Sequence, residues 1–419
     1  MKTPATSFVI VGAGLAGAKA AETLRAEGFD GRIHLVGNEA ERPYERPPLS
    51  KGYLTGSKSR ESIFVHEERW YVDHQVELRT GTRAVSLHPA EHALELEGGE
   101  RMHFDKALLT TGSSARQIDV PGADLDGVHY LRRASDADRL LPALSRGDRS
   151  VVLIGGGWIG LEVAAAARAH GNEVTVVEPQ PTVLHAALGA ELGAMFADLH
   201  REHGVRLLLG DGVRSLQGSA GAVAAVVTTS GQRLPADLVV VGVGAHPNTE
   251  LADSAGLSID NGILVDQSLH SSHPDVFAAG DVANAFHPLL GRHLRVEHWA
   301  NALNGGPAAG RAMLGQAVTY DRIPYFYTDQ YDLGMEYSGA VGPGGYDQVV
   351  YRGDRGSRTF IAFWLKAGRV LAGMNVNTWD VTEPIQALIR SGVAIDVERL
   401  ADPEWPLDDL VRPTPKEIT

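Results

Sequence analysis

Residues 151–164, VVLIGGGWIGLEVA, repeat the pattern of FVIVGAGLAGAKA at residues 8–20. In each copy, a run of apolar and mostly β-branched residues is followed by G-x-G-x-x-G and then by a small-residue helical pattern. This strand, turn and helix order is the one that dinucleotide binding requires. A single G-x-G-x-x-G also occurs in ordinary glycine-rich turns, but two copies in this context predict two nucleotide sites in one chain.

The three glycines of each turn have separate physical roles. The first allows the tight turn, the second lets the backbone approach a pyrophosphate, and the third lets the helix pack closely on its strand. We expect the pyrophosphate at the helix N-terminus, where unpaired N–H groups and the helix dipole favour anions. The glycines are Gly12, Gly14 and Gly17 in the first copy, and Gly155, Gly157 and Gly160 in the second.

The two copies differ at the end of their second strand. In the second copy the strand NEVTVVEPQ ends in Glu178, where an acid can accept hydrogen bonds from an adenosine ribose. In the first copy the strand RIHLVGNE ends at Gly37, with Asn38 and Glu39 after it. We therefore expect the first site to hold a nucleotide whose ribose is bound in a different way.

Composition limits the class of protein. A chain of 419 residues with 43% hydrophobic and 21% charged residues suits two or three globular domains. No segment approaches about 18 uninterrupted apolar residues, and the N-terminus lacks a basic region before a long apolar core. We therefore expect no membrane span, no signal peptide and a cytoplasmic location. The formal net charge of -14 argues against general binding to nucleic acid or anionic membranes.

The chain contains no cysteine. This excludes disulfide relays, thiolate nucleophiles, iron-sulfur ligation and cysteine-based zinc sites. No two histidines stand with acids at a spacing typical of a metal site, so no metal is predicted. Any redox chemistry must therefore use a bound organic cofactor.

The order of the predicted elements suggests how the chain is organised. The first nucleotide unit is followed by an insertion to about residue 70, and then by the short strands and hairpins of VELRTGTRAVSLHPAEHALELEGGERMHFDKALLTTGS. A linker and the helix RASDADRLLPAL precede the second fingerprint, and the helix WANALNGGPAAGRAML comes later. From about Asp321 the aromatic-rich strands IPYFYTDQY and TFIAFWLKAGRVLAGMNVN, the helix VTEPIQALIRSG and a polar tail predict a third, α+β domain.

The chain resembles the pyridine-nucleotide-disulfide-reductase-like flavoproteins and, among them, the FAD-dependent NADH:ferredoxin reductases of bacterial oxygenase systems. The resemblance covers essentially the whole chain. Its most specific stretches are YERPPLSKGYL, TTGSSAR, VVLIGGGWIGLEVA, FAAGDVAN, EHWANAL and IPYFYTDQYDLGMEYSG. It implies an α/β, glutathione reductase-like fold with two Rossmann-like dinucleotide-binding domains and a C-terminal α+β interface domain. The implied domains are FAD-binding at 1–114 and 245–320, NAD-binding at 115–244, and interface at 321–419.

The absence of cysteine then separates the subfamilies. Disulfide reductases carry a redox-active cysteine pair, and related peroxidases and oxidases a single cysteine, on the segment occupied here by RPPLSKGYL. Without sulfur, electrons must leave the flavin directly, and FAD can accept a hydride and release single electrons. The resemblance thus implies an enzyme that uses NADH and FAD to reduce a small [2Fe-2S] ferredoxin feeding a cytochrome-type or Rieske oxygenase. The alternatives are a rubredoxin or quinone-type acceptor, or an NADH-sensing interaction protein resembling apoptosis-inducing factor.

The resemblance implies two catalytic residues, Lys51 and Glu162. Lys51 is either a solvated loop lysine or, as the resemblance implies, a cation beside the flavin that stabilises negative charge developing on reduction. Glu162 is either a helix-surface acid or a residue near the nicotinamide that pairs with Lys51. Arg46 is likewise either a loop cation or a contact near the flavin ring.

Other residues are assigned to cofactor binding by the resemblance. Asp281 suits a helix cap as well as a contact to the FAD ribityl chain. Arg132 would contact FAD instead of being a surface charge, and Trp299 would lie against the isoalloxazine instead of in the core. His298, next to Trp299, is a possible proton donor that nothing singles out. Further main-chain or nucleotide contacts are expected at Ala16, Asn38 (where relatives often have Asp), Ala84, Thr111, Gly112, Ile159, Gly244 and Gly280.

Docking of a ferredoxin poses an electrostatic problem. Ferredoxins are generally acidic, so a chain with net charge -14 needs basic residues gathered at the flavin edge. Relatives place arginines near the positions held here by His66 and Pro307, so part of the expected patch is missing. The remaining candidates are Arg292, Arg295, Arg311 and Arg322. The alternative is that these four arginines are scattered solvated charges with no role in docking. The assembly is expected to be a monomer or a weak dimer.

Overall fold

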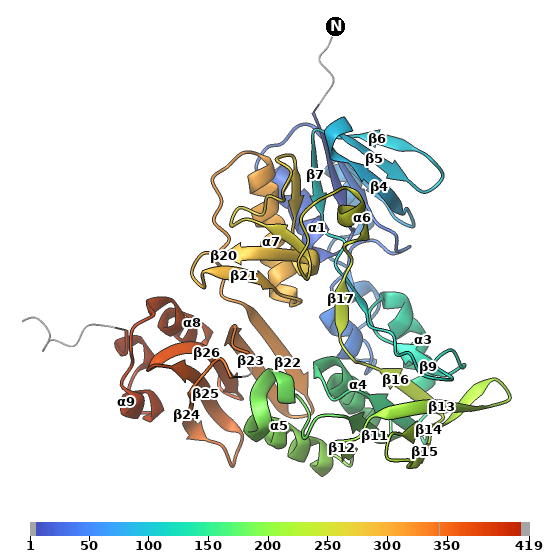
Figure 1. Ribbon diagram of the computed structural model, residues 1–419, viewed down its shortest axis with the longest axis vertical. Coiled ribbons are helices and arrows are strands. Elements are labelled where there is room, and N and C mark those ends of the chain that lie inside the picture. The colour runs from blue at the N-terminus through green and yellow to red at the C-terminus, as the bar shows by residue number, and fades with distance from the viewer. Residues whose placement is uncertain (1–5, 343, 412–419) are drawn as a thin grey trace, which may run out of the picture. The chain divides into compact units, whose positions relative to one another are not determined.

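The computed structural model describes residues 6–342 and 344–411 (Figure 1). These residues form two compact units. Unit 1 contains the described residues up to Arg116, together with Arg132–Ser135 and Gly244–Arg322. Unit 2 contains Gln117–Leu131, Asp136–Val243 and the described residues from Ile323 onward. The expected α/β class, with two Rossmann-like sheets and a C-terminal α+β part, is confirmed. The boundaries at residues 114, 244 and 320 remain predictions.

The centre of unit 1 is a five-stranded parallel sheet. Every residue of its middle strand is buried, as expected where helices cover both faces of a parallel sheet. In sheet order the strands are β19 (Val276–Ala278), β7 (Lys106–Leu109), β1 (Ser7–Val11), β2 (Arg32–Val36) and β3 (Val76–Arg79).

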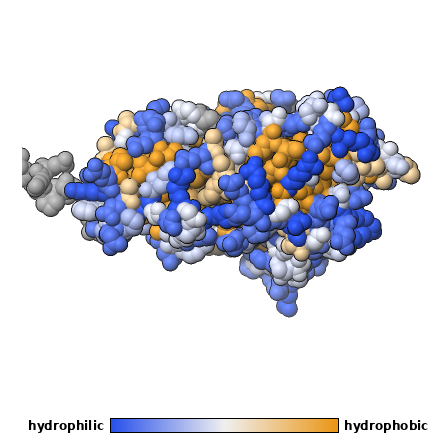
Figure 2. All heavy atoms as spheres, turned by 90° about the horizontal axis from the view of Figure 1, so that it is seen from below, coloured by the Kyte–Doolittle hydropathy of each residue, from blue (hydrophilic) through white to orange (hydrophobic). Residues whose placement is uncertain are grey.

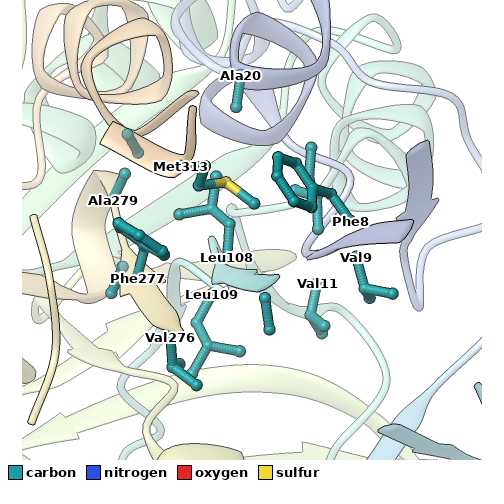
Figure 3. Close-up of a cluster of buried hydrophobic side chains, with 14 of the residues drawn as sticks. Phe8, Val9, Val11, Ala20, Leu108, Leu109, Val276, Phe277, Ala279 and Met313 are labelled. Carbon is teal, nitrogen blue, oxygen red and sulfur yellow. The ribbon is translucent and has the colours of Figure 1, made fainter. Parts of the chain in front are cut away.

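Two helices, α1 (Leu15–Ala26) and α7 (Trp299–Met313), complete this core. Figure 3 shows Ala20 of α1 and Met313 of α7 beside the apolar side chains of β1, β7 and β19. The two helices pack closely because α7 carries glycine at the contact. A Cβ atom at Gly306 would lie 2.2 Å from the carbonyl oxygen of Ala16. Gly306 in NALNGGPAAG is thus explained by the approach of one helix to the other.

Smaller elements surround the core of unit 1. The predicted hairpin region forms the antiparallel sheet β4 (Ala84–His88), β5 (Ala93–Leu96) and β6 (Arg101–His103). The other strands are β8 (Ser113–Ala115) with β17 (Ala245–Pro247), and β18 (Ile263–Val265) with β20 (Ala283–His287) and β21 (Arg292–Arg295). Its short helices are η1 (Pro47–Ser50), η2 (Glu61–Ile63), α2 (Glu68–Asp73), η3 (Pro89–Glu91), α6 (Glu250–Ser254) and η4 (Gly280–Val282).

Unit 2 repeats the parallel architecture. Its sheet runs in the order β12 (Arg206–Leu209), β11 (Glu173–Glu178), β10 (Ser150–Ile154), β16 (Leu238–Val241) and β9 (Val128–Tyr130). The helices are α4 (Trp158–Ala169) and α5 (His185–Glu202). Helix α3 (Ala134–Leu144) begins in the Arg132–Ser135 segment of unit 1 and continues into unit 2. A further antiparallel sheet contains β13 (Val213–Ser219), β14 (Ala222–Thr228) and β15 (Arg233–Pro235).

The rest of unit 2 is the predicted α+β part. Its antiparallel sheet runs in the order β22 (Tyr325–Gln330), β23 (Leu333–Gly339), β26 (Arg369–Val376), β25 (Thr359–Lys366) and β24 (Gln348–Asp354). Helices α8 (Thr382–Ser391) and α9 (Val397–Ala401) lie beside these strands, and η5 (Leu407–Asp409) follows (Figure 1). Phe196 of α5 and Trp364 of β25 belong to one buried cluster, so the α+β part and the second nucleotide-binding part share a core. Most of the predicted polar tail, residues 393–411, is described and contains α9 and η5, and residues 412–419 lie outside the described residues.

The surface is mainly hydrophilic on the face shown in Figure 2, with apolar residues gathered in separate areas. Among the described residues, large hydrophobic side chains with substantial exposure include Ile159, Val243 and Trp379. No helix in the described part of the chain is long and apolar enough to cross a membrane.

Candidate active site

The two glycine-rich turns have the same backbone geometry. Gly12 and Gly155, the first glycine of each, have φ values of +118° and +103°. A Cβ atom would lie 2.1 Å from Thr110 O at Gly12 and 2.4 Å from Gly242 O at Gly155. Any side chain at these two positions would be strained and would meet backbone, so the turn requires glycine.

The other glycines of the turns also match their expected roles. A Cβ at Gly17 or Gly160 would lie 2.2 Å from the carbonyl oxygen of the first glycine, so the third glycine allows the close approach of the helix. A Cβ at Gly14 or Gly157 would meet nothing within 4 Å among the protein atoms described. Each of these residues caps its helix without a side-chain hydrogen bond from any described residue. Both helix N-termini therefore suit an anionic phosphate.

Glu178 is the last residue of β11, beside the second turn. Its Oε2 accepts a hydrogen bond from the backbone N–H of Gly156 at 2.6 Å, and its Oε1 accepts one from the N–H of Gln180 at 2.9 Å. A carboxylate can accept about four hydrogen bonds, so capacity remains for ribose hydroxyls. The carboxylate is thus already oriented by the backbone of the turn it would serve.

The corresponding position of the first turn is Gly37. Val36 pairs with Val11 just as Val177 pairs with Ile154, which places Gly37 in register with Glu178. A Cβ at Gly37 would lie 2.5 Å from the Cβ of Ala13, so no acid fits there. A ribose bound at the first turn therefore could not be held by an acid at this position. The next residue, Asn38, is exposed.

Glu39 has a structural role that the sequence did not reveal. Its Oε2 accepts from the Tyr44 hydroxyl at 2.5 Å, and its Oε1 accepts from Arg46 Nη2 at 3.0 Å. The Tyr44 hydroxyl in turn accepts from the N–H of Ala134 at 3.0 Å, and Arg46 also donates to the carbonyl of Arg132. Arg46 is therefore held in a network and is not a free loop cation.

Asp281 and Arg132 form an ion pair. Asp281 Oδ2 accepts from Arg132 and, at 2.9 Å, from the Ser113 hydroxyl, while Arg132 Nε donates to the Ser113 carbonyl at 2.8 Å. The helix-cap alternative for Asp281 is wrong, because η4 has no side-chain cap from any described residue. The surface-charge alternative for Arg132 is also wrong, because 23% of its side chain is exposed and it makes these contacts.

Gly280 and Ala16 meet beside this ion pair. Gly280 has φ +77°, and a Cβ there would lie 3.2 Å from the Cβ of Ala16, which is buried near the start of α1. The structure therefore brings the first turn close to Gly280 and Asp281, although these residues are far apart along the chain. Ala84, at the start of β4, is half-buried.

Asn248 is a second residue that sequence reasoning missed. Its side chain donates to the Thr111 carbonyl at 2.8 Å and accepts from the Ser114 hydroxyl at 2.7 Å. Its backbone N–H donates to the Gly112 carbonyl at 2.9 Å, and its carbonyl accepts from the Thr111 hydroxyl at 2.7 Å. Asn248 thus holds the segment where Thr111 and Gly112 were predicted to touch the cofactor. Gly244 lies nearby in sequence with φ +102°.

Lys51 and Trp299 both belong to unit 1 and are both half-buried. Lys51 follows η1, and Trp299 begins α7 with His298 as the N-cap residue. Burial lowers the pKa of His298 to about 4, although Asp281 acts to raise it. At neutral pH His298 is therefore uncharged, which does not suit a proton donor.

Glu162 lies in α4 of unit 2 and is 4% exposed, so the helix-surface alternative is wrong. Its Oε1 accepts from the hydroxyl of Thr328 at 2.6 Å. Ile159, one residue before the third glycine, is instead 44% exposed and presents an apolar surface next to the turn. Lys51 and Glu162 belong to different units, and their pairing stays a prediction.

The candidate docking arginines differ in their surroundings. Arg295 is 12% exposed and pairs with Glu297, so it is a poor docking residue. Arg311 is 47% exposed and donates to Glu27 at 2.9 Å, while Arg292 and Arg322 are exposed. Burial lowers the pKa of His66, which leaves it neutral at pH 7 and unable to replace the missing arginine.

No group of three or more possible ligand side chains that could hold a metal occurs within residues 6–342 and 344–411.

Comparison with known proteins confirms the resemblance. Residues 6–306 match the pyridine nucleotide-disulphide oxidoreductase family, and residues 325–411 match a reductase C-terminal domain. Over 400 residues the chain is 40% identical to the ferredoxin–NAD(+) reductase component of the anthranilate 1,2-dioxygenase system of Burkholderia cepacia. That alignment covers 95% of this chain and 98% of that protein.

Solved structures of ferredoxin reductases also resemble this chain. A covalent putidaredoxin reductase–putidaredoxin complex matches with a TM-score of 0.92 and 34% identity, covering 97% of this chain and 98% of that one. The ferredoxin reductase for the CYP199A2 system of Rhodopseudomonas palustris matches with a TM-score of 0.92 and 36% identity, covering 97% and 100%. The family match spans more than half of the sequence and the curated relative aligns along nearly its whole length. The chain therefore belongs to the pyridine nucleotide-disulphide oxidoreductase family.

Proposed function

We propose that this protein reduces a [2Fe-2S] ferredoxin with electrons from NADH, by way of bound FAD, and that the ferredoxin feeds a cytochrome-type or Rieske oxygenase. Membership of the family makes the protein an FAD-dependent oxidoreductase that uses NADH. FAD accepts the hydride and releases the two electrons one at a time, which joins a two-electron donor to a one-electron acceptor.

One observation carries the proposal: the same nucleotide-binding turn is built twice in a chain that has no cysteine. Two turns allow two nucleotides to be held, a donor and a resident cofactor. The lack of any thiol removes the sulfur relay used by disulfide reductases, so the electrons pass from the flavin to an external acceptor.

The residues of unit 1 fit FAD. The open N-terminus of α1 at Gly14 would hold the pyrophosphate, and Gly280, Asp281 and Arg132 would contact the chain that leads to the ring. Lys51 and Trp299 would lie at the ring itself. In unit 2 the N-terminus of α4 and Glu178 would hold NADH.

The named relatives support a ferredoxin as the acceptor. One is the reductase component of a dioxygenase system, and another was solved as a covalent complex with putidaredoxin. NADH is an intracellular nucleotide, which supports a cytoplasmic location.

The test is a visible spectrum of the FAD-loaded protein during NADH titration, followed by turnover with a [2Fe-2S] ferredoxin. We expect the flavin bands to bleach with NADH and the ferredoxin to be reduced in many turnovers. Rapid turnover with a quinone or a rubredoxin and none with any ferredoxin would favour the other acceptors. A long-lived charge-transfer complex without turnover would favour a sensing protein, and no flavin bands after addition of FAD would overturn the proposal.

A further inference from the structure

A chain of buried polar side chains in unit 2 ends on Glu162. Thr328 and Gln330 of β22 and His200 of α5 are each no more than 1% exposed. Thr328 Oγ1 lies 2.6 Å from Glu162 Oε1, and Gln330 Nε2 lies 3.1 Å from Thr328 Oγ1. His200 Nε2 lies 2.8 Å from Gln330 Oε1. Beyond His200, the Tyr331 hydroxyl lies 3.3 Å from His200 Nδ1.

The chemistry of the groups decides which atom donates at each link. The Gln330 carbonyl oxygen can only accept, so His200 must carry its proton on Nε2. The Gln330 amide nitrogen can only donate, so it donates to the Thr328 oxygen. The single Thr328 proton is then left for Glu162, whose ionised carboxylate can only accept. Every link therefore donates in the same direction, toward the Glu162 carboxylate.

A flipped Gln330 amide would not satisfy the same set of bonds. Its oxygen would then face Thr328, whose one proton cannot be donated both to Gln330 and to an ionised Glu162. A fully reversed chain needs three changes together: a protonated Glu162, a flipped Gln330 and a proton on Nδ1 of His200. A proton on Nε2 of His200 thus reports that the chain of hydrogen bonds donates toward Glu162. Burial lowers the pKa of His200 to about 4, so a neutral ring at pH 7 is consistent with this scheme.

We propose that Thr328, Gln330 and His200 are positioning residues that hold the Glu162 carboxylate in one orientation for the oxidation of NADH. The proposal rests on the function given above, together with the position of Glu162 near the nicotinamide that the resemblance implies. When NADH gives up its hydride, two electrons and one proton pass to the flavin and positive charge develops on the nicotinamide ring. A carboxylate that is already charged and oriented stabilises that charge without reorganisation.

The first test reads the tautomer directly in the FAD-loaded protein at pH 7, by ¹⁵N NMR after selective labelling of histidine. The His200 signals are assigned from their loss in His200→Gln or from their shift in Tyr331→Phe. We expect a protonated Nε2 and a bare Nδ1. A proton on Nδ1, or on both ring nitrogens, would overturn the proposal.

The second test measures the rate of flavin reduction by NADH in a stopped-flow instrument. In Thr328→Val we expect the limiting rate at saturating NADH to fall about tenfold, which corresponds to about 1.4 kcal/mol, while the dissociation constant of NADH changes less than twofold. Thr328→Ser keeps the hydroxyl and should restore the rate. Thr228→Val, at another fully buried threonine of unit 2, is the matched control and should leave the rate unchanged.

The outcomes separate the two proposals. A wild-type flavin that NADH does not reduce overturns the proposed function and this inference with it. A wild-type flavin that NADH reduces rapidly, together with an unchanged rate in Thr328→Val or an equal loss in Thr328→Ser, overturns only the role of the chain of hydrogen bonds.

Discussion

At the scale of single residues, we expect Glu178 to set the choice of nucleotide. A 2'-phosphate would lose hydrogen bonds to this carboxylate and meet its charge, and such bonds are worth roughly 1.5 to 3 kcal/mol. We expect kcat/KM for NADH to exceed that for NADPH by about tenfold to a hundredfold or more. Glu178→Gln should lower the ratio of kcat/KM for NADH to kcat/KM for NADPH, because the amide cannot accept at both oxygen positions. Glu173→Gln, at the exposed start of the same strand, should leave it unchanged. Equal kcat/KM values in the wild type would refute the assignment.

Lys51 is the second residue whose charge can be tested alone. An ammonium group beside the flavin favours its reduced, anionic form. Lys51→Met should therefore lower the two-electron midpoint potential, for which about 30 mV equals a tenfold change in equilibrium constant, and slow reduction by NADH. The exposed Lys58, mutated to Met, provides the control. Spectroelectrochemical titration measures the potential of both variants. An unchanged potential in Lys51→Met would favour the interpretation of Lys51 as a solvated loop lysine.

At the scale of elements, the contact between α1 and α7 depends on Gly306. Gly306→Ala would place a Cβ 2.2 Å from Ala16 O and 3.1 Å from Ala20 N, forcing the two backbones apart. We expect the free energy of unfolding to fall by about 1 to 3 kcal/mol and FAD to bind more weakly. Gly305→Ala is the matched control, because its Cβ would lie 3.6 Å from the nearest atom and alanine favours the helix. Urea unfolding with and without FAD checks this, and equal stability of the two variants would contradict the packing argument.

A second prediction at this scale concerns α5, which His200 joins to β22. Burial lowers the pKa of His200 from 6.5 to about 4, so between these pH values the unfolded chain binds more protons at this site than the folded one. Stability is therefore fully present above about pH 6.5 and is lost toward pH 4, by up to about 1.4 kcal/mol per pH unit from this residue. His200→Gln should flatten the decline measured by urea unfolding, whereas exposed His103→Gln should not. The same slope in all three proteins would show that His200 titrates normally.

At the scale of the whole molecule, the net charge of -14 opposes the approach of an acidic ferredoxin. Arg311→Glu should raise KM for ferredoxin several-fold without changing flavin reduction by NADH, and ferredoxin reduction should slow as salt rises above about 0.15 M. Arg201→Glu is the control, since it makes the same charge change at a half-exposed, paired arginine of α5. Steady-state kinetics at two salt concentrations check this. Ferredoxin kinetics that ignore both salt and Arg311→Glu would place docking on another surface.

Several structural features of the candidate site could be predicted because their signals are local. Each glycine-rich turn is encoded within about ten residues, and the structure gives its first glycine a positive φ and its third a close backbone contact. The position of Glu178 at the end of a strand was predictable for the same reason. Local patterns also placed the hairpins of unit 1 and helices α7 and α8. The roles of Glu39 and Asn248 were missed. Glu39 bonds to side chains only five and seven residues away, but in an irregular segment whose turns no short pattern predicts. The partners of Asn248 lie 137 and 134 residues away.

The sequence by itself determined two nucleotide-binding turns and a redox chemistry without sulfur, since glycine spacing, β-branched runs and the absence of cysteine need no knowledge of distant contacts. The tertiary structure alone decided which polar groups face one another. Glu162 meets Thr328 across 166 residues, Arg132 meets Asp281 across 149, and Asn248 meets Thr111 across 137. Burying such groups is favourable only when each finds a partner, and the partner is chosen by how the sheets and helices pack, which no short pattern contains.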